Sequence, residues 1–151
     1  MKRYQNVSLV DLPLSKYDII IALPRDDGGE EIIRAQVKTV SRGKISFRGG
    51  QRGGRDRITI RGVTEYLQNT QTSDVVIGLE EQNGNFVLYF VPTCLIEALS
   101  RSSISVSRVE FLKENHDMLQ RCKDRNYVLQ KCREAGILKS SSQNLFDSSE
   151  E

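Results

Sequence analysis

The chain has 151 residues, of which 28% are charged, and a formal net charge of +2 at pH 7. This length suits one ordinary domain with its own core, not two. No run of about 18 apolar residues is present, and the N-terminal residues lack the apolar stretch and cleavage site of a secretory signal. We therefore expect a cytoplasmic protein with no membrane-spanning segment, built as a single domain over residues 1–138 with a disordered polar tail over 139–151.

Charge is unevenly distributed along the chain. The segment 38–61 holds eight basic residues and one acid, Asp56, so it carries a net charge of +7, against −5 for the rest of the chain. Clustered positive charge of this kind is typical of proteins that neutralise phosphates and release their counterions. The distribution therefore favours a protein that binds nucleic acid.

The first elements along the chain form a predicted hairpin. Residues 17–23 are rich in isoleucine and predict a buried strand that ends at Pro24. The Asp-Gly-Gly sequence that follows supplies the positive φ angles of a hairpin turn. A second strand is predicted over residues 31–40, and the two-residue period of a strand places Gln36 and Lys38 on the same face of it.

The next part of the chain is rich in glycine and arginine. Over residues 41–56 we expect a flexible cationic loop with one short strand, 44–47, and two Arg-Gly-Gly repeats. Such repeats fit a nucleic-acid clamp beside an active site, a short element that binds RNA through arginine stacking, or a solvated loop. Residues 58–68 begin with strand-like alternation and end with helical spacing, so both structures stay open for them.

The remaining elements complete a sheet with helices around it. We expect two strands joined by an Asn83-Gly84 turn, a short helix capped by Thr93, a short strand and two C-terminal helices, the second capped by Asn126 and ended by Gly136. In chain order these elements occupy residues 74–79, 85–91, 93–99, 104–106, 110–121 and 126–135. The pattern predicts an α/β fold, a mixed β-sheet flanked by helices, with further helices at the C-terminal end.

Three polar residues of the predicted hairpin converge at one edge of the sheet. Asp18 opens the first strand, and the second strand presents Gln36 and Lys38 on a common face. This pattern resembles the core of the PD-(D/E)XK nucleases, with glutamine in place of the acidic residue. The variant is similar to the group I intron homing endonucleases of the type found in cyanobacterial transfer-RNA introns, and the similarity extends to the strand that ends at 89–92.

The resemblance implies a restriction-endonuclease-like core and a Mg²⁺-dependent, sequence-specific endonuclease for double-stranded DNA. The implied catalytic residues are Asp18, Gln36 and Lys38, and the implied metal ligands are Asp18, Gln36 and the carbonyl of Val37, since Mg²⁺ prefers oxygen. Lys38 would orient the attacking water and stabilise the charge that develops on the phosphate. The implied partner is a long DNA duplex, bound by a homo-oligomer that is a dimer or a tetramer.

The basic segment is expected to hold this DNA. Most of its cations would contact phosphates, and Gln51 with one or two arginines would reach base edges in the major groove. The residues expected in this role are Lys44, Arg48, Gln51, Arg52, Arg55, Arg57 and Arg61.

The sequence departs from the family at one point. Family members generally carry a further catalytic glutamate on a helix before the aspartate strand, but none of the 17 residues before Asp18 is a glutamate, and Asp11 is the only acid there. A second interpretation therefore stays open, a non-catalytic DNA- or RNA-binding module with a degenerate nuclease fold. Both interpretations predict salt-sensitive binding, and they differ in metal dependence and strand cleavage.

Other reactive residue types are interpreted as structural. The cysteines are far apart and lack metal-ligand spacing, so we expect buried, reduced thiols at Cys94, Cys122 and Cys132. The only histidine, His116, is expected on a helix surface, which argues against histidine-based catalysis. Apolar positions expected to be core or oligomer contacts are Phe111, Leu112, Leu119 and Cys122.

Overall fold

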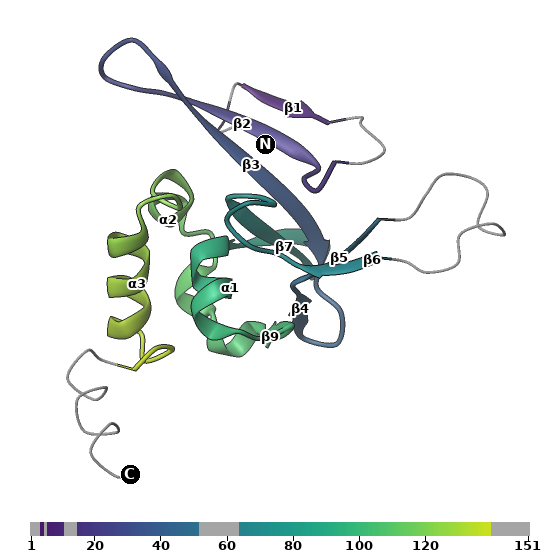
Figure 1. Ribbon diagram of the computed structural model, residues 1–151. Helices are drawn as coiled ribbons and strands as arrows, with labels where there is room; N and C mark the ends of the chain where they lie inside the picture. Colours follow the sequence, from purple (N-terminus) through teal and green to yellow (C-terminus); the bar gives the residue numbers. More distant parts are fainter. Residues whose placement is uncertain (1–3, 5, 11–14, 52–63, 140–151) are drawn as a thin grey trace, which may run out of the picture.

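The computed structural model describes residues 4, 6–10, 15–51 and 64–139 (Figure 1). Within these ranges the strands are β1 (Val7–Leu9), β2 (Ile19–Pro24), β3 (Glu30–Thr39), β4 (Lys44–Ser46), β5 (Arg48–Gln51), β6 (Thr64–Leu67), β7 (Val75–Gln82), β8 (Asn85–Pro92) and β9 (Ser103–Ser105). The helices are α1 (Thr93–Leu99), α2 (His116–Gln120) and α3 (Arg125–Glu134), with short 3₁₀ helices η1 (Val106–Arg108) and η2 (Glu110–Leu112).

The central sheet has the strand order β1-β2-β3-β7-β8. Strand β2 is antiparallel to β3 and β7 is antiparallel to β8, whereas β3 and β7 run parallel. A parallel pair needs a crossover connection, and here the chain between Thr39 and Val75 carries β4, β5 and β6. The predicted α/β class, with a mixed sheet and C-terminal helices, is confirmed.

The hairpin of β2 and β3 forms where the local sequence predicts it. The two strands pair from Ile19 opposite Ala35 to Pro24 opposite Glu30. In the turn, Gly28 has a φ of 84°, which glycine adopts without a steric penalty. Figure 1 shows the turn end of this hairpin reaching beyond the neighbouring strands.

Alternation along β3 divides the sheet into two faces. Ile33 and Ala35 are fully buried in one hydrophobic cluster, together with side chains from β2, β7 and the α2 region. Gln36 pairs with Val76 across the sheet, and Val76 belongs to the other cluster, which contains residues of α1, α3, β4 and β9. The predicted strand period is confirmed, and it places Gln36 and Lys38 on the face that also carries these elements.

Two short ribbons branch from the crossover. Strand β4 pairs with β9 and β5 pairs with β6, both antiparallel. Ile45 of β4 packs directly onto Gly78 of β7, where an added Cβ would lie 2.6 Å from Ile45 Cδ1. A side chain at Gly78 would therefore push the β4–β9 ribbon away from the sheet.

The ribbons correct the prediction for this region. A flexible loop with one short strand at 44–47 was expected over residues 41–56. Strand β4 confirms that short strand, but residues 48–51 form the further strand β5, and residues 52–56 lie outside the described part of the chain. The helical alternative for residues 58–68 is wrong at its C-terminal end, because residues 64–67 pair with β5 as a strand. Their partner is β5, and its glycine-rich sequence does not predict a strand.

Helix α1 has its predicted bounds but not its predicted cap. Pro92 occupies the N-cap position, and the Thr93 hydroxyl instead donates to the Ser73 carbonyl at 2.7 Å. Thr93 is therefore the first residue of the helix, and its hydroxyl ties the helix start to the loop before β7.

The helix expected over residues 110–121 is divided into η2 and α2. Glu114 lies between them with a φ of 49°, and its carboxylate accepts a hydrogen bond from the Leu88 N–H at 2.7 Å. Asn115 then caps α2 by accepting from the Met118 N–H. The contact with β8 outweighs the local preference for one continuous helix.

Helix α3 begins two residues earlier than a cap at Asn126 would allow. Its N-cap is Asp124, whose carboxylate accepts from the Tyr127 N–H at 3.1 Å, and Asn126 lies inside the helix. After the helix, Gly136 takes a φ of 78°, which confirms the predicted glycine stop.

The three cysteines are free and buried, as predicted. Burial raises the pKa of the Cys122 and Cys132 thiols to about 12. Of the apolar positions expected in the core, Leu112 and Leu119 are fully buried, and Phe111 packs against the cluster from a half-buried position.

The predicted single domain stays a prediction, and all but the first residue of the expected tail lies outside the described residues. None of the helices in the described part of the chain has the length and apolar character needed to cross a bilayer.

Candidate active site

Asp18 is placed at the open end of the β2–β3 pair by the main chain. Its N–H donates to the Ala35 carbonyl at 2.8 Å, which extends the pairing of Ile19 and Ala35 by one further bond. The Asp18 side chain is exposed to solvent. The residue therefore stands beside Gln36 at the end of the sheet where β2 begins, with its carboxylate accessible.

The Asp18 carboxylate is held by two N–H donors from β3. Asp18 Oδ2 accepts from Gln36 Nε2 at 2.9 Å and from the Val37 N–H at 2.8 Å. Both distances are those of well-formed hydrogen bonds to a charged acceptor. One of the two donors is main chain, so the position of the carboxylate does not depend on side-chain rotamers alone.

Lys38 completes the predicted set from the same strand. It pairs with Gly78 of β7, and strand alternation puts it on the face of Gln36. The residue is half-buried, and no carboxylate in the described part of the chain forms an ion pair with it. We refer to Asp18, Gln36 and Lys38 together as the polar edge.

Val37 contributes its main chain to this edge. Its N–H points to Asp18, while its side chain packs against the hydrophobic cluster of the opposite face. The structure thus brings Asp18, Gln36 and Val37 into direct contact. The use of the Val37 carbonyl as a metal ligand stays a prediction.

Tyr66 of β6 is a further residue of the site that the sequence did not single out. The Lys16 ammonium lies 5.3 Å from the centre of its ring. Burial raises the pKa of the Tyr66 phenol, the Gln68 amide acts in the opposite direction, and the negative charge of Asp18 raises it further. Tyr66 is therefore a neutral hydroxyl donor at physiological pH, close enough to the polar edge for Asp18 to act on it electrostatically.

The ring of Tyr66 lies against the backbone of the opposite strand. Gly49 pairs with Tyr66 across the β5–β6 ribbon, and an added Cβ at Gly49 would lie 2.3 Å from Tyr66 Cζ. Glycine is required for this close approach. Gly49, which belongs to the first Arg-Gly-Gly repeat, therefore makes room for the Tyr66 ring.

Gln68, two residues further on, is fully buried. Its Oε1 accepts from the Thr72 hydroxyl at 2.7 Å and from the Ser73 hydroxyl at 2.8 Å. Its Nε2 has no well-formed hydrogen bond within the described structure. These contacts fix the chain between β6 and β7, and with it the position of Tyr66.

The predicted DNA-binding residues are only partly covered by the described structure. Lys44 lies on β4 and Arg48 on β5, both exposed. Gln51 ends β5. The remaining residues of this group lie outside the described part of the chain: Arg52, Arg55, Arg57 and Arg61.

The described residues contain no group of three or more histidine, cysteine, aspartate or glutamate side chains placed to hold a metal ion. At the polar edge, Asp18 can offer a carboxylate to a metal. The oxygen atoms left unused by the contact between Asp18 and Gln36 are Asp18 Oδ1 and Gln36 Oε1. Hard oxygen ligands of this kind, completed by water and phosphate, suit Mg²⁺.

The prediction of a surface position for His116 is wrong. Its side chain is 16% exposed, its Nδ1 lies 2.7 Å from the Tyr4 hydroxyl, and its ring packs against Phe90. The helix that carries His116 packs on β8, which buries the ring. The histidine therefore has a structural place on the opposite face of the sheet from Gln36.

The fold and the polar edge together define an α/β protein with an exposed carboxylate, a half-buried amide and a half-buried lysine at the end of a mixed sheet. The sequence matches no protein-family model and no curated protein. Among solved structures, a bacterial homing endonuclease, I-Ssp6803I, superposes with a TM-score of 0.44 and 17% identity over 66% of this chain and 62% of that chain. The matched region spans less than two thirds of that endonuclease. A likeness at this TM-score carries no functional weight, so the function is inferred from the site.

Proposed function

We propose that this chain is a Mg²⁺-dependent, sequence-specific endonuclease that hydrolyses phosphodiester bonds in double-stranded DNA, of the homing type. The observation that supports this most directly is the Asp18 carboxylate, which hydrogen bonds from Gln36 and Val37 hold at the edge of the sheet. Lys38 shares the face of Gln36, so its ammonium group would reach the same accessible place as the carboxylate and the amide.

The polar edge would hold the metal through Asp18 and Gln36, with the Val37 carbonyl as a third oxygen. Mg²⁺ is commonly bound by one or two carboxylates together with water and substrate phosphate, which matches a site with one aspartate. When bound, Mg²⁺ would polarise the scissile phosphate and lower the pKa of the attacking water.

Lys38 would act on the phosphate itself. A fixed ammonium group stabilises the negative charge that grows on the phosphate oxygens in the transition state. Half-burial of Lys38 limits its screening by water, and it has no competing carboxylate partner among the described residues. Its charge is thus available to the substrate.

Tyr66 would add a neutral donor beside this charge. A tyrosine phenol is protonated at neutral pH, and burial raises the pKa of Tyr66 further, so its hydroxyl can donate to a non-bridging phosphate oxygen. Close contact with Gly49 limits the movement of the ring. Tyr66 would therefore position the phosphate, and the exposed cations Lys44 and Arg48 would contact neighbouring phosphates.

Cutting both strands of a duplex requires two active sites, and we extend the proposal to a homo-oligomer, a dimer or a tetramer, acting in the cytoplasm. Two exposed apolar side chains lie on the outer strands of the sheet, Leu9 on β1 at 83% exposure and Phe86 on β8 at 66%. Light scattering on the purified protein should give a mass of two or four chains.

One observation favours a second candidate function, a non-catalytic DNA- or RNA-binding module. The described residues hold no group of three or more metal-ligating histidine, cysteine or acidic side chains, and a site with few carboxylates binds Mg²⁺ more weakly than a richer one. Such a module would keep the hairpin and the basic surface, and its binding would remain salt-sensitive.

A cleavage assay separates the two functions. Purified protein is incubated with a library of DNA duplexes in Mg²⁺ or in EDTA, and sequencing of the ends reports discrete double-strand breaks. We expect breaks in Mg²⁺ that disappear in EDTA. Lys38→Ala should slow cleavage by about 100-fold or more, because it removes one fixed charge from the transition state, while DNA binding is nearly unchanged.

Lys131→Ala is the matched control, since it removes the same charge from an exposed position on α3. It should cleave at the rate of the unmodified chain. Salt-sensitive binding without metal-dependent breaks would decide for the binding module. Equal cleavage by Lys38→Ala and Lys131→Ala would remove Lys38 from the mechanism.

A further inference from the structure

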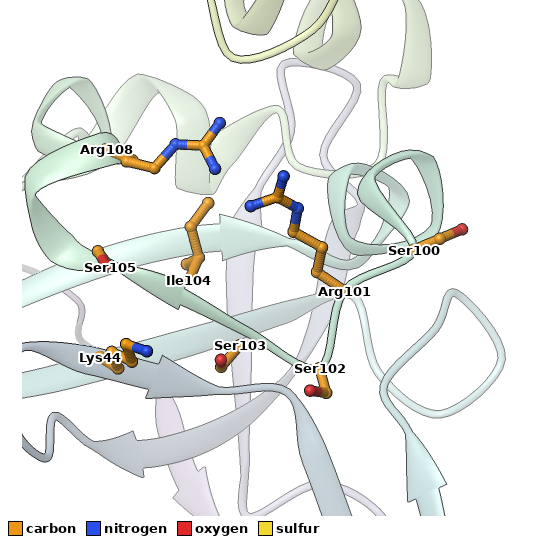
Figure 2. Close-up of a pocket in the computed structure, with 8 residues that line it drawn as sticks. All are labelled: Lys44, Ser100, Arg101, Ser102, Ser103, Ile104, Ser105 and Arg108. Carbon is orange, nitrogen blue, oxygen red and sulfur yellow. The ribbon is translucent and has the colours of Figure 1, made fainter.

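A second basic site lies outside the segment to which the sequence drew attention. An open pocket of about 450 Å³ is formed where the end of α1, strand β9 and η1 follow one another (Figure 2). Its lining combines cations, serines and one isoleucine: Lys44, Ser100, Arg101, Ser102, Ser103, Ile104, Ser105 and Arg108. We call it the arginine pocket.

The arginine pocket is built on a fixed strand. Ile104 of β9 is 3% exposed and belongs to the hydrophobic core, so its neighbours Ser103 and Ser105 turn outward by strand alternation. Lys44 of β4 pairs with Ser105 across the ribbon. The serine hydroxyls and the lysine therefore stand on a ribbon whose other side is anchored in the core.

Two guanidinium groups lie on the same side of this ribbon. Figure 2 shows Arg101, before β9, and Arg108, in η1, directing their guanidinium groups toward one another on the same side of the strand. Both residues are exposed. Two like charges so oriented repel unless an anion lies between them.

No described carboxylate neutralises these cations. The two acids nearest in sequence are engaged elsewhere: Glu97 accepts from Thr70 at 2.7 and 2.8 Å, and Glu110 lies 3.6 Å from the Lys113 ammonium. The structure records no ion pair for Lys44, Arg101 or Arg108 within the described residues. The hydroxyls of Ser102, Ser103 and Ser105 likewise make no hydrogen bond there, which leaves them as free donors.

We infer that the arginine pocket binds phosphates of the DNA backbone, as a second contact with the duplex apart from the polar edge. Arginine recognises phosphate oxygens through paired N–H donors, and serine hydroxyls add neutral donors around the same anion. The inference rests on the proposed function for the identity of the polyanion as duplex DNA.

The shape of the pocket favours a polymer backbone over a small phosphorylated ligand. Sites for small molecules usually enclose most of the ligand, whereas this pocket is open along one side. Lys44 belongs both to the pocket and to the basic segment 38–61, so the pocket adjoins the described part of that segment on β4. A duplex held by the basic segment would pass this surface.

The test compares DNA binding by the full chain with that of an Arg101→Ala/Arg108→Ala double variant. Fluorescence anisotropy with a labelled duplex is measured in EDTA over a range of salt concentrations, so cleavage does not interfere. Each phosphate contact contributes about 0.9 to the slope of log affinity against log salt concentration, so the double variant should lose about two units of slope and bind more weakly. An Arg101→Lys/Arg108→Lys variant keeps the charge and should keep most of the slope.

The matched control is Lys131→Ala/Arg133→Ala, which removes two charges from exposed positions on α3. An unchanged salt slope in the double arginine variant overturns the inference, and so does an equal loss of slope in the α3 control. A full chain that does not bind duplex DNA overturns it as well. Binding that loses two units of slope in a protein that never cleaves DNA supports the inference and contradicts the proposed nuclease.

Discussion

Replacing Gln36 by glutamate tests the polar edge without relying on activity. In the present chain Gln36 Nε2 donates to Asp18 Oδ2 at 2.9 Å. Gln36→Glu puts a second carboxylate at this distance. Two unit charges about 4 Å apart repel by about 1 kcal/mol in water, and the lost hydrogen bond at this exposed position adds up to about 1 kcal/mol. We expect the free energy of unfolding in EDTA at pH 7 to fall by about 1–2 kcal/mol.

Magnesium should reverse this loss. The second carboxylate turns the repulsive pair into two anionic ligands, so Mg²⁺ binds the folded variant more tightly than the unmodified chain. At a Mg²⁺ concentration ten times the dissociation constant, binding to the folded state restores about 1.4 kcal/mol. Urea unfolding followed by circular dichroism, with Mg²⁺ and with EDTA, measures both effects.

The matched control is Gln130→Glu on α3. Gln130 Nε2 also donates to a carboxylate, Glu134 Oε1, at 3.2 Å, but on an exposed helix with no main-chain donor at the acceptor. It should lose only a few tenths of a kcal/mol. The same stability for Gln36→Glu and the unmodified chain in EDTA, or an equal Mg²⁺ response in the two variants, would refute a metal-binding role for the polar edge.

Three further predictions follow from the packing. Gly49→Ala puts a Cβ 2.3 Å from Tyr66 Cζ, so the ring must move, and we expect a loss of about 1–3 kcal/mol in unfolding free energy. Arg34→Ala removes the guanidinium that lies 2.9 Å from an Asp74 carboxylate only 9% exposed, and should cost about 2–4 kcal/mol in denaturant unfolding. Burial raises the pKa of Cys122 to about 12, so its thiol stays protonated at pH 8 and should react with a disulfide reagent only after unfolding.

Each of the two substitutions has a control. Tyr66→Ala should relieve the clash, so the double variant with Gly49→Ala should lose less than the sum of the single variants. Arg25→Ala breaks an ion pair with Asp27 whose two side chains are more than half exposed, and should change stability by less than about 0.5 kcal/mol. Additive losses at Gly49 and Tyr66, or an equal cost for Arg25 and Arg34, would contradict the packing described above.

Local signals in the sequence were sufficient for the hairpin and the polar edge. The isoleucine-rich strand, the glycine turn and the two-residue period of β3 each act over a few residues, and together they place Gln36 and Lys38 on one face. The contact between Asp18 and Gln36 then follows from antiparallel pairing, which the short turn imposes. No long-range information was needed for these features.

Features that depend on distant parts of the chain could not be predicted in this way. Tyr66 comes close to Asp18 because β6 pairs with β5, and the glycine-rich sequence of β5 does not indicate a strand. The break at Glu114 follows from its hydrogen bond to Leu88 on β8. Arg101 and Arg108 are seven residues apart in an unpatterned stretch, and only the fold of β9 and η1 brings their guanidinium groups together.

The pairing register of β2 and β3 serves the core and the polar edge at once. Ile21 opposite Ile33 buries the inner face, and the same register sets Asp18 beside the Val37 N–H. A slip of one residue would turn every buried side chain of β2 outward, a cost that the core does not tolerate. Burial of the inner isoleucines thus fixes the register that places Asp18 beside Gln36 and Val37. A designer could exchange the inner isoleucines for other apolar residues of similar volume, and the spacing between Asp18 and Gln36 should survive.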